Sequence, residues 1–297
     1  GSFLFLITPP PPQSRADVIP RDLTFVLDVS GSMAHNGKLD QAREALIQCV
    51  GALGEEDRFR VITFSTDVEP MSRDFLAANS ENRKRAEAWL RERPPRGGTN
   101  IEGALREALA PVLAREMSAG RLRVIVFLTD GIPTVGETTP KAILRNVEDT
   151  NTAALRIFTL GLGYDVNARL LDDLAAATSA AADYVKPGEN IESRVTAFFD
   201  KVSAPTLTNC RIEVEGAEVS DLYPRRLPDL FAGQQLLVFG RYRRPGEARV
   251  ILRGERRGKE EVHRFTARLP EREVENRFVE TLWGTRKIRS EERRVGK

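Results

Sequence analysis

Cysteine and histidine are scarce in this sequence of 297 residues, which contains two of each. Two cysteines cannot form the several disulfides that stabilise small secreted domains, so the fold must be stabilised by packing. No apolar run reaches the roughly 18 residues that a membrane-spanning helix needs. Neither sign of charge dominates, and a net charge of +2 argues against a dedicated nucleic-acid binder.

The composition indicates two globular domains. A hydrophobic fraction of 41% is too high for a disordered chain, and the length fits about two domains of 100–200 residues. The net charge is −4 through residue 203 and +6 afterwards, and the apolar pattern changes at the same point, so we expect a domain boundary there. The chain begins Gly1-Ser2 without an initiator Met, which indicates a fragment or a processed piece of a longer protein.

Before residue 203, short apolar runs alternate with amphipathic stretches. The run over 23–27 ends at Asp28 and is typical of a strand covered on both faces, whereas the apolar residues of 38–53 recur at helical spacing. Further strands are expected at 59–64, 122–128, 157–162 and 182–185, an edge piece at 68–75, and helices at 80–92, 101–117, 140–149, 167–178 and 191–202. This alternation predicts an α/β fold with a doubly wound, mostly parallel, Rossmann-like sheet.

The remaining residues predict a small antiparallel β-sandwich. Apolar and polar residues alternate over 210–214, 235–242, 248–252 and 261–267. The apolar run 3–7 precedes a proline-rich connector, and we expect this strand to pair with the sandwich, so that the α/β domain is inserted into it. The expected division is 1–12 (sandwich strand and connector), 22–203 (α/β domain), 204–272 (sandwich) and 273–297 (C-terminal helix and tail). On that helix, Phe278, Leu282, Trp283 and Ile288 are expected to form one apolar face that docks on a neighbour.

Polar residues with metal-ligating oxygens follow two of the buried strands. Asp28-Val29-Ser30-Gly31-Ser32 begins at the end of the first strand, and Thr129-Asp130-Gly131 ends another. A third segment, Gly97-Gly98-Thr99-Asn100, is a turn that opens a helix. Ligands of open α/β sheets bind outside the carboxyl ends of the strands where the strand order reverses, so these three segments are expected to meet there.

These segments predict a site for a hard cation. They supply oxygens from Asp28, Ser30, Ser32, Thr99 and Asp130. Such a set suits Mg²⁺, with Mn²⁺ or Ca²⁺ as alternatives, and offers nothing to a soft metal. If the hydroxyls ligate directly and the carboxylates act through water, the ion keeps much of its charge and attracts an outside carboxylate. Helix capping by the two aspartates is the simpler interpretation, but it does not explain the hydroxyls.

The constellation resembles the metal-ion-dependent adhesion site of von Willebrand factor type A domains. The resemblance covers about residues 22–203 and includes D-x-S-x-S, the later Thr and the Thr-Asp-Gly segment. It implies that Ser30 and Ser32 are direct ligands, that Asp28 and Asp130 are bridged mainly by water, and that Thr99 is direct or water-bridged.

A narrower resemblance is to the heavy chains of inter-α-trypsin inhibitor and their bacterial relatives. It rests on three flanking segments, 3–10, 20–28 and 282–288. This resemblance implies an extracellular, cell-surface or periplasmic protein that engages protein partners; a cytoplasmic location is the alternative. The partner expected at the metal is a protein that presents Asp or Glu.

The sequence therefore favours a non-enzymatic binding module over two other classes. An Mg²⁺-dependent phosphoryl hydrolase would use Asp28 as a nucleophile, but Ser30 stands where such enzymes carry a second carboxylate, and no Ser-His-Asp arrangement is evident. An RNA-binding protein similar to the Ro type is the other alternative. The chain lacks the helical-repeat ring of that type and has no interleaving of aromatic and basic residues.

Overall fold

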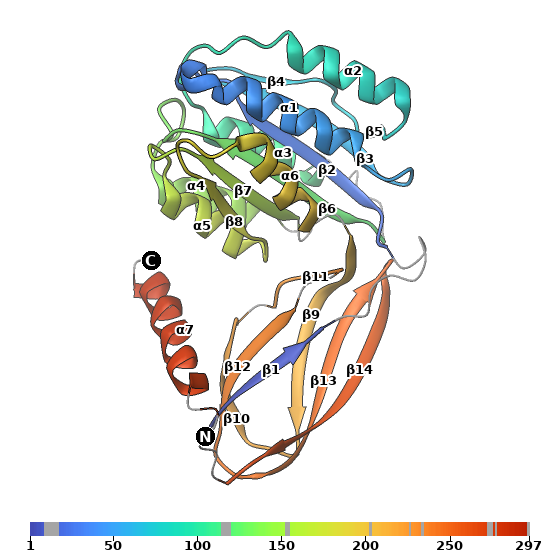
Figure 1. Cartoon of the computed structure of the whole chain (residues 1–297), viewed down its shortest axis with the longest axis vertical. Helices are drawn as coiled ribbons and strands as arrows, with labels where there is room; N and C mark the ends of the chain where they lie inside the picture. The colour runs from blue at the N-terminus through green and yellow to red at the C-terminus, as the bar shows by residue number, and fades with distance from the viewer. Residues whose placement is uncertain are drawn as a thin grey trace. The chain divides into compact units, whose positions relative to one another are not determined.

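The structure is a computed structural model that describes residues 1–8, 18–113, 120–151, 155–201, 204–225, 227–232, 235–271, 276 and 278–295. The chain divides into two compact units: Ile19–Ser203, and a second unit made of Gly1–Val18 together with Ala204–Lys297. In chain order the α/β unit is therefore inserted after the first strand of the other unit (Figure 1). The proline-rich connector expected at 9–12 lies outside the described residues.

The α/β unit contains the doubly wound, mostly parallel sheet that the sequence predicts. In spatial order its strands are β4 (Val68–Pro70), β3 (Arg58–Phe64), β2 (Arg21–Asp28), β6 (Leu122–Thr129), β7 (Arg156–Leu162) and β8 (Ala182–Val185), and β5 (Leu76–Ala77) also pairs with β3. Only β4 and β5 run antiparallel to their neighbour among these strands. The chain passes from β2 to β3 and later resumes at β6 on the other side of β2, so the strand order reverses between β2 and β6.

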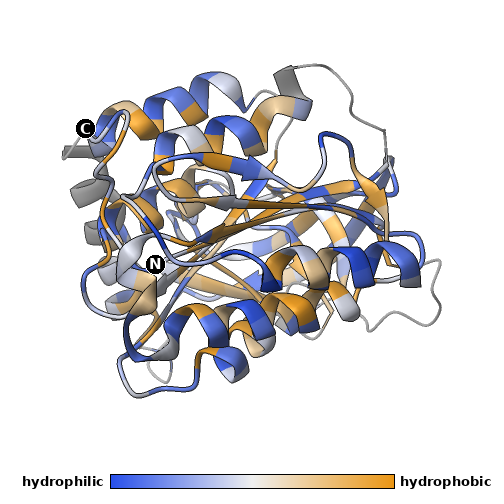
Figure 2. Cartoon of the chain, turned by 90° about the horizontal axis from the view of Figure 1, so that it is seen from above, coloured by the Kyte–Doolittle hydropathy of each residue, from blue (hydrophilic) through white to orange (hydrophobic). Residues whose placement is uncertain are grey.

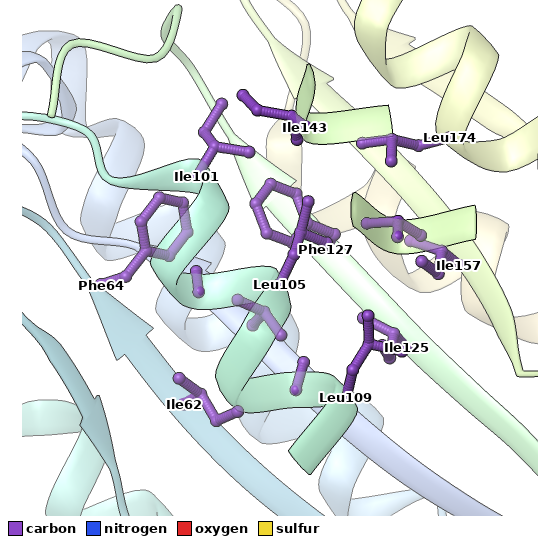
Figure 3. Close-up of a cluster of buried hydrophobic side chains, with 14 of the residues drawn as sticks. Ile62, Phe64, Ile101, Leu105, Leu109, Ile125, Phe127, Ile143, Ile157 and Leu174 are labelled. Atoms are coloured by element: carbon purple, nitrogen blue, oxygen red, sulfur yellow. The ribbon is translucent and has the colours of Figure 1, made fainter. Parts of the chain in front are cut away.

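Helices cover both faces of this sheet (Figure 1). They are α1 (Lys38–Gly51), α2 (Ser80–Arg91), α3 (Ile101–Leu113), α4 (Pro140–Thr150), α5 (Ala168–Ala177) and α6 (Ile191–Lys201). Apolar residues of α3, α4 and α5 pack with one face of the sheet, where Leu105 and Phe127 are among the buried residues (Figure 3). On the other face, the ring of Phe199 on α6 lies 5.9 Å from that of Phe25 on β2.

The central strands of this sheet, β3, β2, β6 and β7, are mostly apolar because both of their faces are buried. Figure 2 shows the strands mostly in hydrophobic colours between helices whose outer sides are hydrophilic. All eight residues of β2 are buried, including Asp22, which accepts hydrogen bonds from Arg58 Nε at 2.9 Å and Arg121 Nε at 2.6 Å. Burial of a carboxylate is tolerated here because it is paired with guanidinium groups.

The second unit is the antiparallel β-sandwich that the sequence predicts. One sheet has the order β1 (Ser2–Ile7), β12 (Leu236–Tyr242), β10 (Val219–Tyr223), and the other has the order β11 (Leu230–Phe231), β9 (Pro205–Glu215), β13 (Gly246–Arg256), β14 (Lys259–Leu269). The first strand pairs antiparallel with β12, as expected. Ile7 and Val238 from one sheet share a buried cluster with Leu207 and Leu252 from the other.

Two strands of the sandwich were not predicted. β11 has two residues, too few to show any alternation. The pairing of β10 with β12 shifts register between Ser220 and Tyr223, and Asp221 has a positive φ of 51°. A bulge of this kind interrupts the period of two on which strand prediction depends.

The expected apolar face of the C-terminal helix was wrong in part. On α7 (Phe278–Val295), Trp283 packs with Tyr223 and Phe239, but Phe278 and Leu282 remain 54% and 43% exposed. Val279, four positions before Trp283, is buried as Trp283 is. Residues four apart share a helix face, whereas Leu282 is rotated about 100° away from its neighbour.

Candidate metal centre

The loop after β2 and the loop before α3 are joined by backbone hydrogen bonds. The amide of Gly31 donates to the carbonyl of Gly97 at 3.0 Å, and the amide of Arg96 donates to the carbonyl of Val29 at 2.8 Å. A Cβ at position 31 would lie 3.4 Å from the Gly97 oxygen, an ordinary van der Waals distance. The two loops therefore hold the D-x-S-x-S segment against the Gly-Gly-Thr-Asn segment at the carboxyl edge of the sheet.

Asp28 is completely buried at the end of β2. Its Oδ1 accepts the backbone N–H of Ser30 at 2.8 Å, and its Oδ2 accepts the hydroxyl of Thr129 at 2.6 Å. Burial raises the pKa of this carboxyl from 3.8 to about 6. These hydrogen bonds oppose the rise, and the negative charge of Asp130 adds to it. Ionisation of Asp28 therefore costs more than that of an exposed carboxyl, and a bound cation would offset this cost.

Two serine hydroxyls form a relay that ends at Asp130. The hydroxyl of Ser32 donates to Asp130 Oδ1 at 2.7 Å, and it lies 3.1 Å from the hydroxyl of Ser30. A serine hydroxyl has one hydrogen and two lone pairs. The hydroxyl of Ser30 has both Ser32 and the carboxylate of Asp28 as hydrogen-bond partners. Whichever of the two accepts its hydrogen, each serine oxygen keeps at least one lone pair that can face a cation.

Thr99 joins the same site from the third segment. Its backbone N–H donates to the hydroxyl of Thr134 at 2.8 Å, and the amide of Thr134 donates back to the carbonyl of Thr99 at 2.9 Å. The Thr99 hydroxyl lies 3.4 Å from the point that a Cβ on Gly131 would occupy, so it is adjacent to the backbone that follows Asp130. The structure therefore brings all five predicted residues together at the point where the strand order reverses.

A lysine that sequence reasoning missed also lies in this site. Lys38, the first residue of α1, donates a hydrogen bond from Nζ to Asp130 Oδ2 and forms an ion pair with it. These two residues are 92 positions apart in the chain. A charged residue at the first helical position after the D-x-S-x-S loop was the available signal, but nothing in the sequence shows which carboxylate it reaches.

The donor set fits a hard divalent cation and no other kind of metal. Across the described ranges there is no group of three or more His, Cys, Asp and Glu side chains that would hold a metal ion, so any site here depends on hydroxyls. Oxygen ligands of this type suit Mg²⁺, Mn²⁺ or Ca²⁺. His35, in the loop before α1, is exposed.

Comparison with known proteins identifies the fold and the family. Residues 21–180, more than half of the chain, match the family described as von Willebrand factor type A domain. The chain belongs to the von Willebrand factor type A domain family. The family resemblance expected from the sequence is thereby confirmed. A type A domain of Catenulispora acidiphila superimposes with a TM-score of 0.69 at 16% identity, covering 88% of this chain and 68% of that one.

The type A domain and its flanking sandwich are similar to longer proteins. Inter-alpha-trypsin inhibitor heavy chain H4 of Sus scrofa is 32% identical over 89% of this chain, and heavy chain H2 of Homo sapiens is 30% identical over 82%. The chain spans only 30% and 26% of the lengths of these two relatives. A pilus adhesin, SpaC, from Lactobacillus rhamnosus GG has a TM-score of 0.53 at 14% identity, covering 90% of this chain and 46% of that one.

Both cysteines of the chain, Cys49 and Cys210, are buried and form no disulfide. Burial raises the pKa of the Cys49 thiol to about 12. A thiol with so high a pKa is neither a nucleophile nor a metal ligand at neutral pH.

Within the described part of the chain, no helix is long and apolar enough to cross a membrane.

Proposed function

We propose that the chain is a divalent-metal-dependent protein-binding module. Ser30, Ser32 and Thr99 would ligate Mg²⁺ through their hydroxyls, while Asp28 and Asp130 would hold it mainly through water. A bound divalent ion supplies a concentrated positive charge with an open position, and the carboxylate of a partner's Asp or Glu completes its shell. Mn²⁺ and Ca²⁺ are the alternative ions.

The observation that carries this proposal is that the hydroxyl oxygens keep lone pairs for a cation. Ser32 donates its hydrogen to Asp130 and Ser30 lies beside it, so each serine oxygen retains at least one lone pair. Within the described residues the Thr99 hydroxyl is in no hydrogen bond. Neutral ligands of this kind leave the ion more electrophilic than a cage of carboxylates would, which favours capture of an outside acid.

Two exposed apolar side chains indicate where the partner would contact the domain. Ile132 and Tyr164 are 53% and 76% exposed, and they are the exposed large hydrophobic side chains in the described part of the α/β unit. Each follows the end of a strand by a few residues, and β6 and β7 are paired neighbours. They therefore lie in loops on the edge of the sheet that carries Asp130. A partner segment with an apolar residue near its carboxylate would fit this edge.

Catalysis receives less support from the site. Asp28, the residue that a phosphoryl hydrolase would use as its nucleophile, is completely buried and hydrogen-bonded through both oxygens. A nucleophile must reach its substrate, so this geometry favours a non-enzymatic role. The pilus adhesin among the structural neighbours is consistent with an adhesive role. We propose that the protein acts at the cell surface or outside the cell.

Calorimetric titration of the EDTA-stripped protein with Mg²⁺ and Mn²⁺ tests the proposal. We expect the parent to bind both ions and Ser30→Ala and Thr99→Ala to lose at least about tenfold in affinity, because each variant lacks one ligand. Ser72→Ala, which removes a hydroxyl far along the chain from the site, is the matched control and should bind as the parent does. A folded parent that binds neither ion would contradict the proposal.

The proposed contact of the partner with Ile132 and Tyr164 is tested separately. The double variant Ile132→Ser and Tyr164→Ser should bind Mg²⁺ with unchanged affinity. Proteins that the parent retains in Mg²⁺ and releases in EDTA should be retained much less by this variant. Equal retention by both chains would place the partner elsewhere on the domain.

A further inference from the structure

Lys38 occupies an unfavourable position for a lysine unless it serves the site. It is the first residue of α1, after Gly37 in the left-handed region with φ of 64°, and its backbone N–H donates to the carbonyl of His35. The amino end of a helix carries partial positive charge, which repels a cation. Helix propensity therefore does not explain this lysine, whereas its ion pair with Asp130 does.

The ion pair is well shielded from water. The carboxylate of Asp130 is completely buried and the side chain of Lys38 is 18% exposed. Asp130 Oδ2 is taken by the ammonium and Oδ1 by the hydroxyl of Ser32, so the relay and the lysine together satisfy this carboxylate. Without the ammonium, Asp130 would be a buried carboxylate near that of Asp28 with no ion-pair partner among the described residues.

The charges in the site then have a definite consequence. Asp28 and Asp130 contribute −2 and Lys38 contributes +1, so the metal-free site has a net charge of −1. A divalent ion that approaches Asp130 meets the ammonium on the same carboxylate and must either displace it or remain beside it. Both cases weaken the binding of the ion, since like charges repel and displacement breaks a buried ion pair.

We propose that Lys38 is an internal cation of the metal centre, which neutralises Asp130 in the metal-free chain and competes with the divalent ion for it. This inference rests on the proposed metal-dependent function. The other groups near Lys38 do not substitute for it: His35 is exposed in the preceding loop, and Asp40 in the first turn of α1 is paired with Arg43. Lys38 thus acts as a positioning and affinity-setting residue, and it makes the site stable before any metal binds.

The experiment compares Lys38→Met, Lys38→Gln and Lys38→Arg with the parent. Met keeps the aliphatic stem without the charge, Gln keeps a polar end, and Arg keeps the charge. Lys141→Met is the matched control, because Lys141 is an exposed lysine in the first turn of another helix, α4. Mg²⁺ affinity is measured by calorimetry, and the melting temperature is measured in EDTA and in Mg²⁺.

We expect Lys38→Met and Lys38→Gln to bind Mg²⁺ at least about tenfold more tightly than the parent. These variants lose the repulsion between the ammonium and the divalent ion, and charges of +1 and +2 about 5 Å apart in a water-like dielectric account for a change of this size. Lys38→Arg and Lys141→Met should stay within about threefold of the parent. In EDTA the two neutral Lys38 variants should melt at a lower temperature than the parent, and Mg²⁺ should raise their melting temperatures by more.

The outcomes separate this inference from the proposed function. A parent that binds Mg²⁺ together with neutral variants that bind it equally or more weakly would overturn the role of Lys38 and leave the metal site intact. Neutral variants that bind Mg²⁺ when the parent does not would support the competition by Lys38 and contradict metal binding by the parent chain. If neither the parent nor any folded variant binds Mg²⁺ or Mn²⁺, both the proposed function and the role of Lys38 are wrong.

Discussion

Replacing Asp28 by Asn should change how the stability of the metal-free protein depends on pH. The pKa of Asp28 is raised from 3.8 to about 6, chiefly by burial. Between these two values the folded chain retains a proton that the unfolded chain releases. The folded state then binds more protons, so the contribution of Asp28 to stability is present below about pH 4 and is lost as the pH rises through 6.

The size of the effect follows from the same two values. One pKa unit corresponds to about 1.4 kcal/mol, so the parent should lose about 3 kcal/mol of unfolding free energy from this residue between pH 4 and pH 7. The amide side chain of the variant would have no charge to bury, and its carbonyl oxygen would still accept the N–H of Ser30. The Asp28→Asn variant should therefore lack this part of the pH dependence.

The assay uses the tryptophans, one of which lies in each unit. In a Trp283→Phe background, the fluorescence of Trp89 on α2 reports unfolding of the α/β unit alone. Urea unfolding in EDTA at several values between pH 4 and pH 7 gives the free energies for the parent and for Asp28→Asn. Asp149→Asn, which changes an exposed carboxylate, is the control. Parallel curves for the parent and Asp28→Asn would refute the reasoning.

Three further changes test the packing of the two units. Asp57→Ala should destabilise the α/β unit by about 3–5 kcal/mol in urea unfolding. The buried guanidinium of Arg21 would lose the carboxylate that accepts a hydrogen bond from its Nη2 at 2.6 Å. A loss of unfolding free energy below about 1 kcal/mol would contradict this. Phe3→Ala should destabilise the sandwich by about 3–5 kcal/mol, since it removes a buried ring, and an unchanged melting temperature would argue against β1 as part of the core. Gly254→Ala should destabilise the sandwich by about 1–3 kcal/mol, because its Cβ would lie 2.4 Å from Leu207 Cγ; equal stability would mean that Leu207 moves freely.

The parallel sheet and the position of the five site residues could be predicted because buried parallel strands leave an unmistakable pattern. A strand covered on both faces is apolar throughout, so the first polar residues after it mark its carboxyl end. Asp28 and Asp130 stand at such points, and parallel strands bring those ends to one edge. Metal binding by these residues stays a prediction, to be tested by the titrations proposed above.

The features that the sequence did not reveal depend on contacts between distant residues. Which side of α7 is buried depends on the sheet beneath it, and two faces of that helix carry apolar residues, so Val279 could not be preferred over Leu282 from spacing alone. The ion pair of Lys38 with Asp130 joins residues 92 apart. Nothing in the local sequence of either residue specifies the other, because the pairing exists only after the loop and the helix are placed.

The construction of the site also indicates what metal binding can change. The loops that carry the serines and Thr99 are joined to each other by backbone hydrogen bonds at Gly31 and Arg96, and the carboxylates already have hydrogen-bond partners in the protein. A structural zinc site, by contrast, is unfolded without its metal. Because the protein itself assembles this site, a divalent ion need not organise it, and the affinity for the ion should depend mainly on the local charge. A single lysine on Asp130 is then well placed to set that affinity.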